Sequence, residues 1–145
     1  MKTRLLTAAL VLAATVNVTA DPTDGSYVRT GAWQPGTGGR IPSCGADIRR
    51  DLAAYSAAID GYDLSRERLT VRGETLPFMY ADAASGTRLY GVTQRDTRDG
   101  HRLESTAGMM VWTDGTSATA LTLTVDGQVR CIDTFRAPFS RKMGT

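Results

Sequence analysis

Three Asp-Gly pairs divide the second half of the chain and limit what it can fold into more than any other feature. Runs rich in β-forming residues flank each of them: Asp99-Gly100, Asp114-Gly115 and Asp126-Gly127. Asp-Gly pairs tolerate the positive φ angles of the tightest hairpin turns. The stretch 69–135 therefore predicts successive antiparallel strands joined by short hairpins.

Alternation of apolar and polar residues supports the same interpretation at the start of this stretch. Leu69 and Val71 alternate with polar residues, and a turn at Gly73-Glu74 leads into the next strand. Pro77 cannot donate a ladder hydrogen bond, so that strand should lie at an edge or contain a bulge. The pattern predicts a meander of about seven antiparallel strands, which can close into a small barrel to hide its edges.

One helix is expected before the sheet, over residues 46–60. Apolar side chains recur there at spacings of four, three and four residues, namely at Ile48, Leu52, Tyr55 and Ile59. This period places them on one helix face. Ser43 is the expected N-cap and Gly61 the expected stop. The fold class is therefore mainly β with one helix, and an α+β arrangement is the alternative.

Residues 1–20 predict a secretory signal peptide. Lys2 and Arg4 form a basic start, residues 5–16 an uncharged, mostly apolar run, and residues 18–20 a small-residue cleavage site. The apolar run is shorter than the roughly 20 residues that cross a bilayer. We expect a periplasmic or secreted protein without stable membrane insertion, and an uncleaved anchor is the alternative.

Charge gives no reason to expect a nucleic-acid partner. Residues 1–20 hold two of the 17 Lys and Arg and none of the 15 Asp and Glu, so the rest of the chain carries 15 of each sign. Nucleic-acid binding depends on clustered Lys and Arg that neutralise phosphates. The sequence therefore predicts no nucleic-acid binding.

Two cysteines in an exported chain favour one disulfide, because oxidising compartments form and keep such bonds. A bond between Cys44 and Cys131 would join the start of the helix to the last strand and close most of the domain. We therefore expect three segments after the signal peptide. Residues 21–43 form a Gly/Pro-rich lead-in with little regular structure, residues 44–136 a single β-rich domain, and residues 137–145 a flexible tail.

No residue pattern indicates catalysis. His101 is the only histidine, it follows a turn, and spacing identifies no nucleophile near it. A zinc site needs three or four N, S or O ligands, and an oxidised cysteine pair leaves few. Several carboxylates fall at turns, where such side chains cap backbone amides: Asp82, Asp96, Asp99, Asp114 and Asp126. We predict no catalytic residue, no metal and no cofactor.

Three pieces of the predicted sheet carry a family resemblance. They are residues 84–90 (ASGTRLY), Trp112-Thr113-Asp114-Gly115, and residues 126–131 (DGQVRC). They resemble the C-terminal half of the exported inhibitors of c-type lysozyme, the MliC and PliC proteins, and of the related adhesin complex protein. In that family a Ser-Gly motif with a nearby Tyr precedes a strand with a Trp and a Lys-Gly turn. A disulfide there joins the first strand to the last.

The resemblance implies a small antiparallel β-barrel whose loops enter the lysozyme cleft. Ser85 would match the inserting serine, Gly86 the turn behind it and Tyr90 the motif tyrosine. Asp114 stands where the family carries lysine, and its charge would be repelled by the catalytic carboxylates of the enzyme. The segment after Cys44 also departs from the family, because it predicts a helix where the family has strands.

The sequence as a whole favours an exported, non-catalytic binding protein. Its most specific version is an inhibitor of c-type lysozyme that uses Ser85, Gly86, Tyr90 and Asp114. One alternative is a small-ligand carrier with a pocket between sheet and helix, or an envelope interaction module. Another is a small enzyme that uses His101. A filled core around Phe78, Trp112 and Leu121 would count against the carrier.

Overall fold

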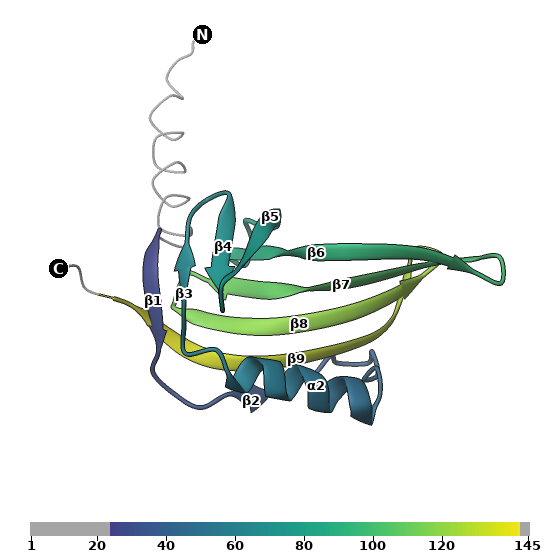
Figure 1. Cartoon of the computed structure of the whole chain (residues 1–145), viewed down its shortest axis with the longest axis horizontal. Coiled ribbons are helices and arrows are strands. Elements are labelled where there is room, and N and C mark those ends of the chain that lie inside the picture. The colour runs from purple at the N-terminus through teal and green to yellow at the C-terminus, as the bar shows by residue number, and fades with distance from the viewer. Residues whose placement is uncertain (1–23, 143–145) are drawn as a thin grey trace, which may run out of the picture.

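The first and last strands of the described residues pair with each other, and this pairing closes the sheet into a barrel. The computed structural model describes residues 24–142, and within them β1 pairs antiparallel with both β3 and β9. The barrel contains eight antiparallel strands, and each other neighbouring pair follows the chain order (Figure 1). The signal peptide predicted over residues 1–20 lies outside the described residues.

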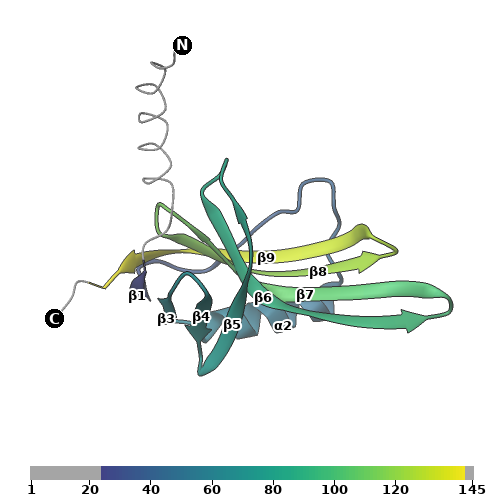
Figure 2. The same ribbon diagram turned by 90° about the horizontal axis from the view of Figure 1, so that it is seen from above.

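The strands differ greatly in length. The barrel strands are β1 (Gly25–Arg29), β3 (Gly61–Leu64), β4 (Arg68–Val71), β5 (Glu74–Asp82), β6 (Thr87–Arg98), β7 (His101–Trp112), β8 (Thr116–Val125) and β9 (Gln128–Arg141). A further short strand, β2 (Gln34–Pro35), pairs with the edge of β9. Because β6 to β9 are much longer than β1, β3 and β4, they extend beyond the closed end as two projecting hairpins (Figure 2).

The predicted hairpins are confirmed, and one of their turns is displaced by one residue. Both residues of Asp99-Gly100 and of Asp126-Gly127 have positive φ, as the tightest two-residue turns require. The turn between β4 and β5 uses Arg72-Gly73, one residue earlier than the predicted Gly73-Glu74. The register of β5 against β6 shifts between Phe78 and Tyr80, so the bulge expected from Pro77 is confirmed.

Aromatic and aliphatic side chains fill the closed end of the barrel. Tyr27 stacks on Tyr62 with ring centroids 5.1 Å apart, and Tyr62 contacts Phe139 at 5.0 Å. The buried cluster comprises Tyr27, Ile59, Tyr62, Leu64, Leu69, Val71, Leu76, Tyr90, Met109, Val111, Ala137 and Phe139. These residues come from β1, every strand from β3 to β7, β9 and the segment after the helix, so the closed end depends on both termini of the domain.

These contacts correct the predicted domain limits. The lead-in 21–43 was expected to have little regular structure and the tail from 137 to be flexible, but residues 25–29 and 137–141 are barrel strands. Trp33 also packs on Phe139 and donates a hydrogen bond to the Ile59 carbonyl (3.3 Å). The sequence hid these strands because each contributes only one or two buried side chains, which is too few for a visible alternation.

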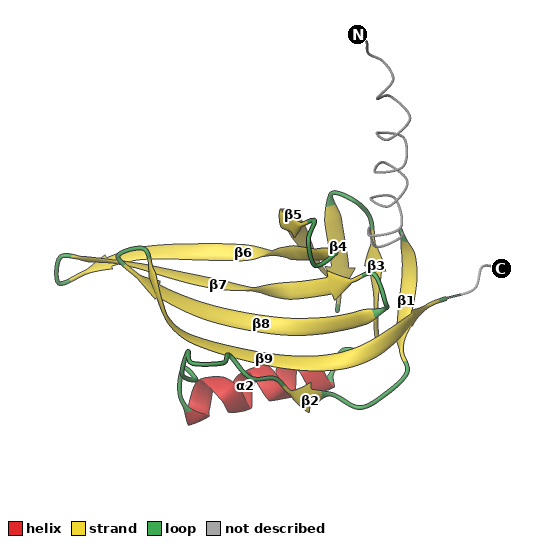
Figure 3. Cartoon of the chain, turned by 180° about the vertical axis from the view of Figure 1, so that it is seen from behind, coloured by secondary structure: helices red, strands yellow, loops and turns green. Residues whose placement is uncertain are grey.

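The predicted helix is confirmed as α2 (Ala46–Ala57), which ends three residues before the expected limit. It packs on β8 and β9, on the face that continues from the barrel interior (Figure 3). Leu52 and Ser56 are buried there, and the hydroxyls of Ser56 and Thr119 lie 2.6 Å apart. The predicted N-cap is wrong: Gly45 occupies that position without a side-chain bond, and the Ser43 hydroxyl donates to Asp133 (2.7 Å) instead.

The predicted disulfide is present and ties the start of α2 to β9. Cys44 and Cys131 are bonded across a sequence separation of 87 residues. The backbone N–H of Cys44 also donates to Asp133 (2.9 Å), a buried carboxylate two residues along β9. The helix is therefore anchored at its beginning by one covalent bond and by hydrogen bonds to one strand.

Replacing both cysteines by serine should lower the free energy of unfolding by about 4 to 5 kcal/mol, because the bond closes a long loop in the unfolded chain. Chemical denaturation of oxidised wild type and of C44S/C131S measures the difference. Wild type under reducing conditions is the control and should match the variant. A loss below about 1 kcal/mol would show that the loop is already restricted without the bond.

Candidate functional site

The antiparallel strand order brings two of the predicted binding segments to one end of the barrel. Thr87 pairs with Trp112 at the end of the β6–β7 ladder. Ser85 precedes Thr87 by two residues and Asp114 follows Trp112 by two, so their turns lie on neighbouring hairpins. We call residues 83–86 and 113–115 the turn rim. It lies at the closed end of the barrel, away from the projecting hairpins.

Internal hydrogen bonds hold the Ser85 turn in shape. The Ser85 hydroxyl donates to Asp82 Oδ2 (3.0 Å) and lies 2.8 Å from the Thr87 hydroxyl. Gly86 has a φ of +69°, which favours glycine, and its N–H donates to the Asp82 carbonyl (2.9 Å). The turn therefore presents an exposed serine on a backbone that is fixed before any partner binds.

The Asp114 turn is similarly ordered and carries a negative charge. Asp114 Oδ1 accepts a hydrogen bond from the Thr116 N–H (2.8 Å). Hydrogen bonds from the backbone and side chain of Thr116 lower the pKa of this exposed carboxyl below its usual range. The rim therefore keeps its negative charge at this position to a lower pH than an ordinary aspartate would.

Tyr90 does not lie on the rim. None of its surface is exposed, and its hydroxyl donates to the Ser65 carbonyl (2.8 Å) from within the barrel core. Burial raises its pKa, so the phenol stays neutral. The structure brings Ser85, Gly86 and Asp114 together and places Tyr90 behind them, where it can support the hairpin but cannot contact a partner.

An exposed apolar segment that was not predicted from the sequence leads into the same turn. Phe78, Met79 and Tyr80 on β5 are all exposed, and the Tyr80 side chain most of all at 59%. The bulge at this point makes neighbouring side chains depart from simple alternation. Three successive large apolar residues after Pro77 were the signal that could have indicated a surface site.

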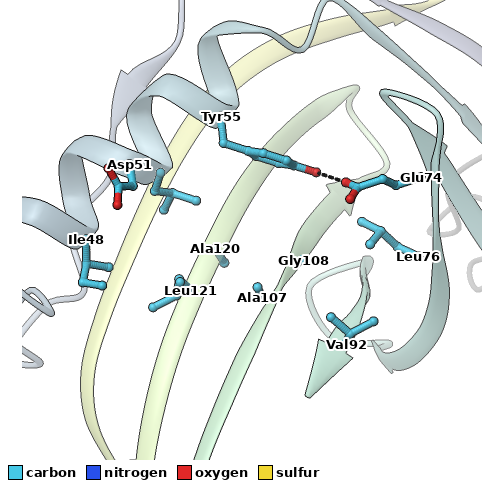
Figure 4. A pocket seen from close by; sticks show the side chains of 11 residues that line it. Ile48, Asp51, Tyr55, Glu74, Leu76, Val92, Ala107, Gly108, Ala120 and Leu121 are labelled. Carbon is cyan, nitrogen blue, oxygen red and sulfur yellow. Dashed lines mark hydrogen bonds between the residues drawn. The ribbon is translucent and has the colours of Figure 1, made fainter. Parts of the chain in front are cut away.

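A cavity of about 400 Å³ lies at the open end, between α2 and the inner face of β6, β7 and β8 (Figure 4). We call it the helix groove. Its lining consists mostly of apolar side chains and small residues: Ile48, Asp51, Leu52, Tyr55, Glu74, Leu76, Val92, Ala107, Gly108, Ala120 and Leu121. Leu121 therefore borders a cavity and is not part of a filled core. A filled core around this residue would have counted against a small-ligand carrier, so Leu121 gives no argument against that alternative.

Polar groups are found only at the edges of the helix groove. The Tyr55 side chain reaches from α2 to β5 and donates to Glu74 Oε1 (3.2 Å), which bridges the two elements (Figure 4). Burial and the neighbouring Glu74 carboxylate raise the pKa of Tyr55. The Arg72 guanidinium lies 5.0 Å from the centre of the Tyr55 ring. Asp51 stands on the exposed side of the helix.

His101 has a carboxylate partner at the far end of the long hairpins. Its Nδ1 lies 2.7 Å from Asp126 Oδ2, and the other oxygen of Asp126 accepts from the Arg102 N–H (2.9 Å). The bonds from Arg102 and His101 lower the pKa of Asp126. The imidazole side chain is 61% exposed and does not exclude water. The pair joins two hairpin ends and does not form an enclosed acid-base site.

The other predicted chemistry-bearing residues form no cluster in the described part of the chain. No group of three or more His, Cys, Asp or Glu there could hold a metal ion. Residues 24–142 also contain no helix long and apolar enough to cross a membrane. Asp82, Asp114 and Asp126 each accept backbone N–H bonds at turns, as predicted for such carboxylates.

Comparisons with known proteins identify no relative: no protein-family model, no curated protein and no solved structure matches this chain. The resemblance to the lysozyme inhibitors consequently stays a hypothesis drawn from three short motifs.

Stability should decrease as the pH rises above the ordinary tyrosine pKa of 10.0. Burial raises the pKa of Tyr62 and of Tyr90, so the folded state keeps these protons while the unfolded state releases them. The stabilisation is complete below the unfolded pKa and is lost at higher pH. Denaturant unfolding over an alkaline pH series, followed alongside phenolate absorbance, measures this dependence.

The variant Y62F is the control for that experiment. It removes one of the buried phenols, so its unfolding free energy should fall less steeply with pH than that of wild type. It also leaves the Ser117 hydroxyl without its 2.7 Å partner, so its stability should be lower at neutral pH. Equal pH slopes for the two proteins would contradict the proposed effect of Tyr62.

Proposed function

We propose that this protein is an exported, non-catalytic binding protein that uses the turn rim to bind another protein, and specifically that it inhibits a c-type lysozyme by loop insertion. One observation carries the proposal: the β5–β6 and β7–β8 turns, which the resemblance assigns to the partner, are neighbours at one end of a closed barrel. The disulfide fits a periplasmic or secreted location, because such bonds persist in oxidising compartments.

The rim combines the features of a protein-binding surface. Ser85 and Asp114 provide polar groups on ordered turns, and the exposed apolar segment at residues 78–80 provides contact area beside them. Tyr, Phe and Met are enriched at protein interfaces, and a few such residues supply most of the binding energy. A barrel closed by β1 and β9 already holds these groups in place, so little conformational entropy is lost when a partner binds.

The charge at Asp114 limits how well this rim suits a lysozyme cleft. A carboxylate placed near the catalytic carboxylates of the enzyme is repelled, whereas the family has an attractive lysine at that turn. Inhibition by the present chain would therefore depend more on the serine turn and the apolar segment than on this position. The same charge would favour a target with a basic surface beside its cleft.

The direct test measures lysozyme digestion of bacterial cell walls in the presence of purified residues 21–145. Near-stoichiometric protein should slow the digestion by a c-type enzyme, and a g-type lysozyme serves as the specificity control. No slowing of the c-type enzyme at a large molar excess would overturn the lysozyme version of the proposal.

Truncation of the apolar segment should weaken partner binding. The variant Y80A removes the most exposed ring next to the Ser85 turn, and we expect affinity to fall about fivefold or more, as at interface hot spots. V129A is the matched control because Val129 is also exposed but lies beside the turn between β8 and β9, at the opposite end. Calorimetry with lysozyme compares the two, and an equal loss in both variants would argue against the rim.

Reversing the charge at position 114 should strengthen inhibition. D114K replaces repulsion with attraction toward the enzyme's carboxylates, and we expect about tenfold tighter inhibition at low salt, with a smaller gain at high salt. D114N removes the charge but keeps an oxygen that can accept from the Thr116 N–H, so it should give an intermediate value. Weaker inhibition by D114K than by wild type would show that Asp114 does not face these carboxylates.

A further inference from the structure

The helix groove is separate from the turn rim, and its surroundings define a ligand class. We propose that it binds an amphiphilic cation, a molecule with a hydrocarbon body and an ammonium head. Two cross-strand pairs of the β6–β7 ladder are buried between the helix groove and the turn rim, namely Arg88 with Val111 and Tyr90 with Met109. This proposal is therefore independent of lysozyme binding and can hold if that binding fails.

The floor of the groove offers apolar surface that no part of the described chain covers. Val92, Ala107 and Leu121 lie opposite one another on three adjacent strands. Ala107 is the smallest of the three, so the middle of the row is hollow. Val92 is 46% exposed although it is on the face that continues from the core. Covering such apolar surface stabilises a complex, and the cavity volume lies within the range of small-molecule sites.

The helix is held so that it cannot close this hollow. Its start is fixed to β9 by the disulfide and by the bonds from Ser43 and the Cys44 N–H to Asp133. Near its end, the buried Ser56 and Thr119 hydroxyls fix it to β8. These contacts lie on the β8 and β9 side, and on the other side of the groove the Tyr55–Glu74 hydrogen bond joins the helix to β5. The inner face of β6 and β7 is left open, so the site exists before a ligand binds.

Charges at the groove favour a cation over an anion. The two charged residues of the lining, Asp51 and Glu74, are both acidic. Arg50 lies 3.8 Å from Asp51 and offsets part of its charge, while the hydrogen bond that Glu74 accepts comes from the neutral Tyr55 hydroxyl. The Arg72 guanidinium already lies over the Tyr55 ring, 5.0 Å from its centre, so that face is not free for a ligand cation. Neither Arg72 nor Arg50 is among the lining residues, so the surface that faces a ligand carries the two carboxylates. A fatty acid would instead place its carboxylate beside two others.

Three probes of equal chain length separate the hydrocarbon contribution from the charge. Decyltrimethylammonium, decanol and decanoate, each below its micelle concentration, are titrated into residues 21–145 by calorimetry. We expect the ammonium probe to bind roughly tenfold more tightly than decanoate, with decanol between them, and this advantage to shrink at high salt. Equal affinities, no binding of any probe, or tighter decanoate binding would overturn the proposal.

Variants locate the binding and identify the charges. A107F fills the middle of the floor and should abolish binding of all three probes. T106F places the same side chain on the next residue of β7, which points to the opposite face, and should bind as wild type. The double variant D51N/E74Q should lose the preference for the ammonium probe but keep decanol affinity. Unchanged binding in A107F, or an unchanged preference in D51N/E74Q, would contradict the assignment.

Folding of each variant is checked by thermal unfolding before the titrations. V92K provides a readout that a misfolded protein cannot imitate, because it places a cation at an already exposed position of the groove. The variant should reverse the order of affinities, with decanoate bound more tightly than decyltrimethylammonium. Retention of the wild-type order would place the probes outside the helix groove.

Discussion

The pairing of β1 with the end of β9 is the constraint on which the rest of the structure depends. It turns an open meander into a closed barrel, and so removes the free edges that a long sheet would otherwise expose. It also brings Tyr27 and Phe139, from opposite ends of the domain, onto Tyr62. The closed end is a filled core for this reason, and the turns at that end are held on a rigid support.

Unequal strand lengths then create the second feature of the molecule. β6 to β9 continue past the short strands, and their inner face is left without an opposing sheet. Helix α2 covers only the part of that face to which it is fixed by Cys131, Asp133 and Thr119. The uncovered remainder is the helix groove. The anchors on β8 and β9 therefore determine both where the helix lies and where a ligand could enter.

Much of the local structure could be predicted because it depends on neighbouring residues. The Asp-Gly turns, the period of Ile48, Leu52 and Tyr55, and the bulge after Pro77 all follow from backbone geometry and short-range burial. The strands at 25–29 and 61–64 could not be found in this way. They are short, and they are strands because β9 and β4 supply their hydrogen-bond partners.

The same difference between local and long-range structure applies to the candidate sites. The sequence pointed to Ser85, Gly86 and Asp114, which are turn residues with local hydrogen bonds, and it also pointed to Tyr90, which the barrel buries. A pocket between sheet and helix was only an alternative at the level of sequence, and its floor could not be located there, because Val92, Ala107 and Leu121 are ordinary strand residues that form a hollow only through the register of three strands.

By itself the sequence determined the mainly β class, the hairpins, the helix and the cysteine pair, since each is encoded by spacing along the chain. The tertiary structure alone decided the closure, the exposure of residues 78–80 and the position of the groove, because these arise from contacts between segments far apart in the chain.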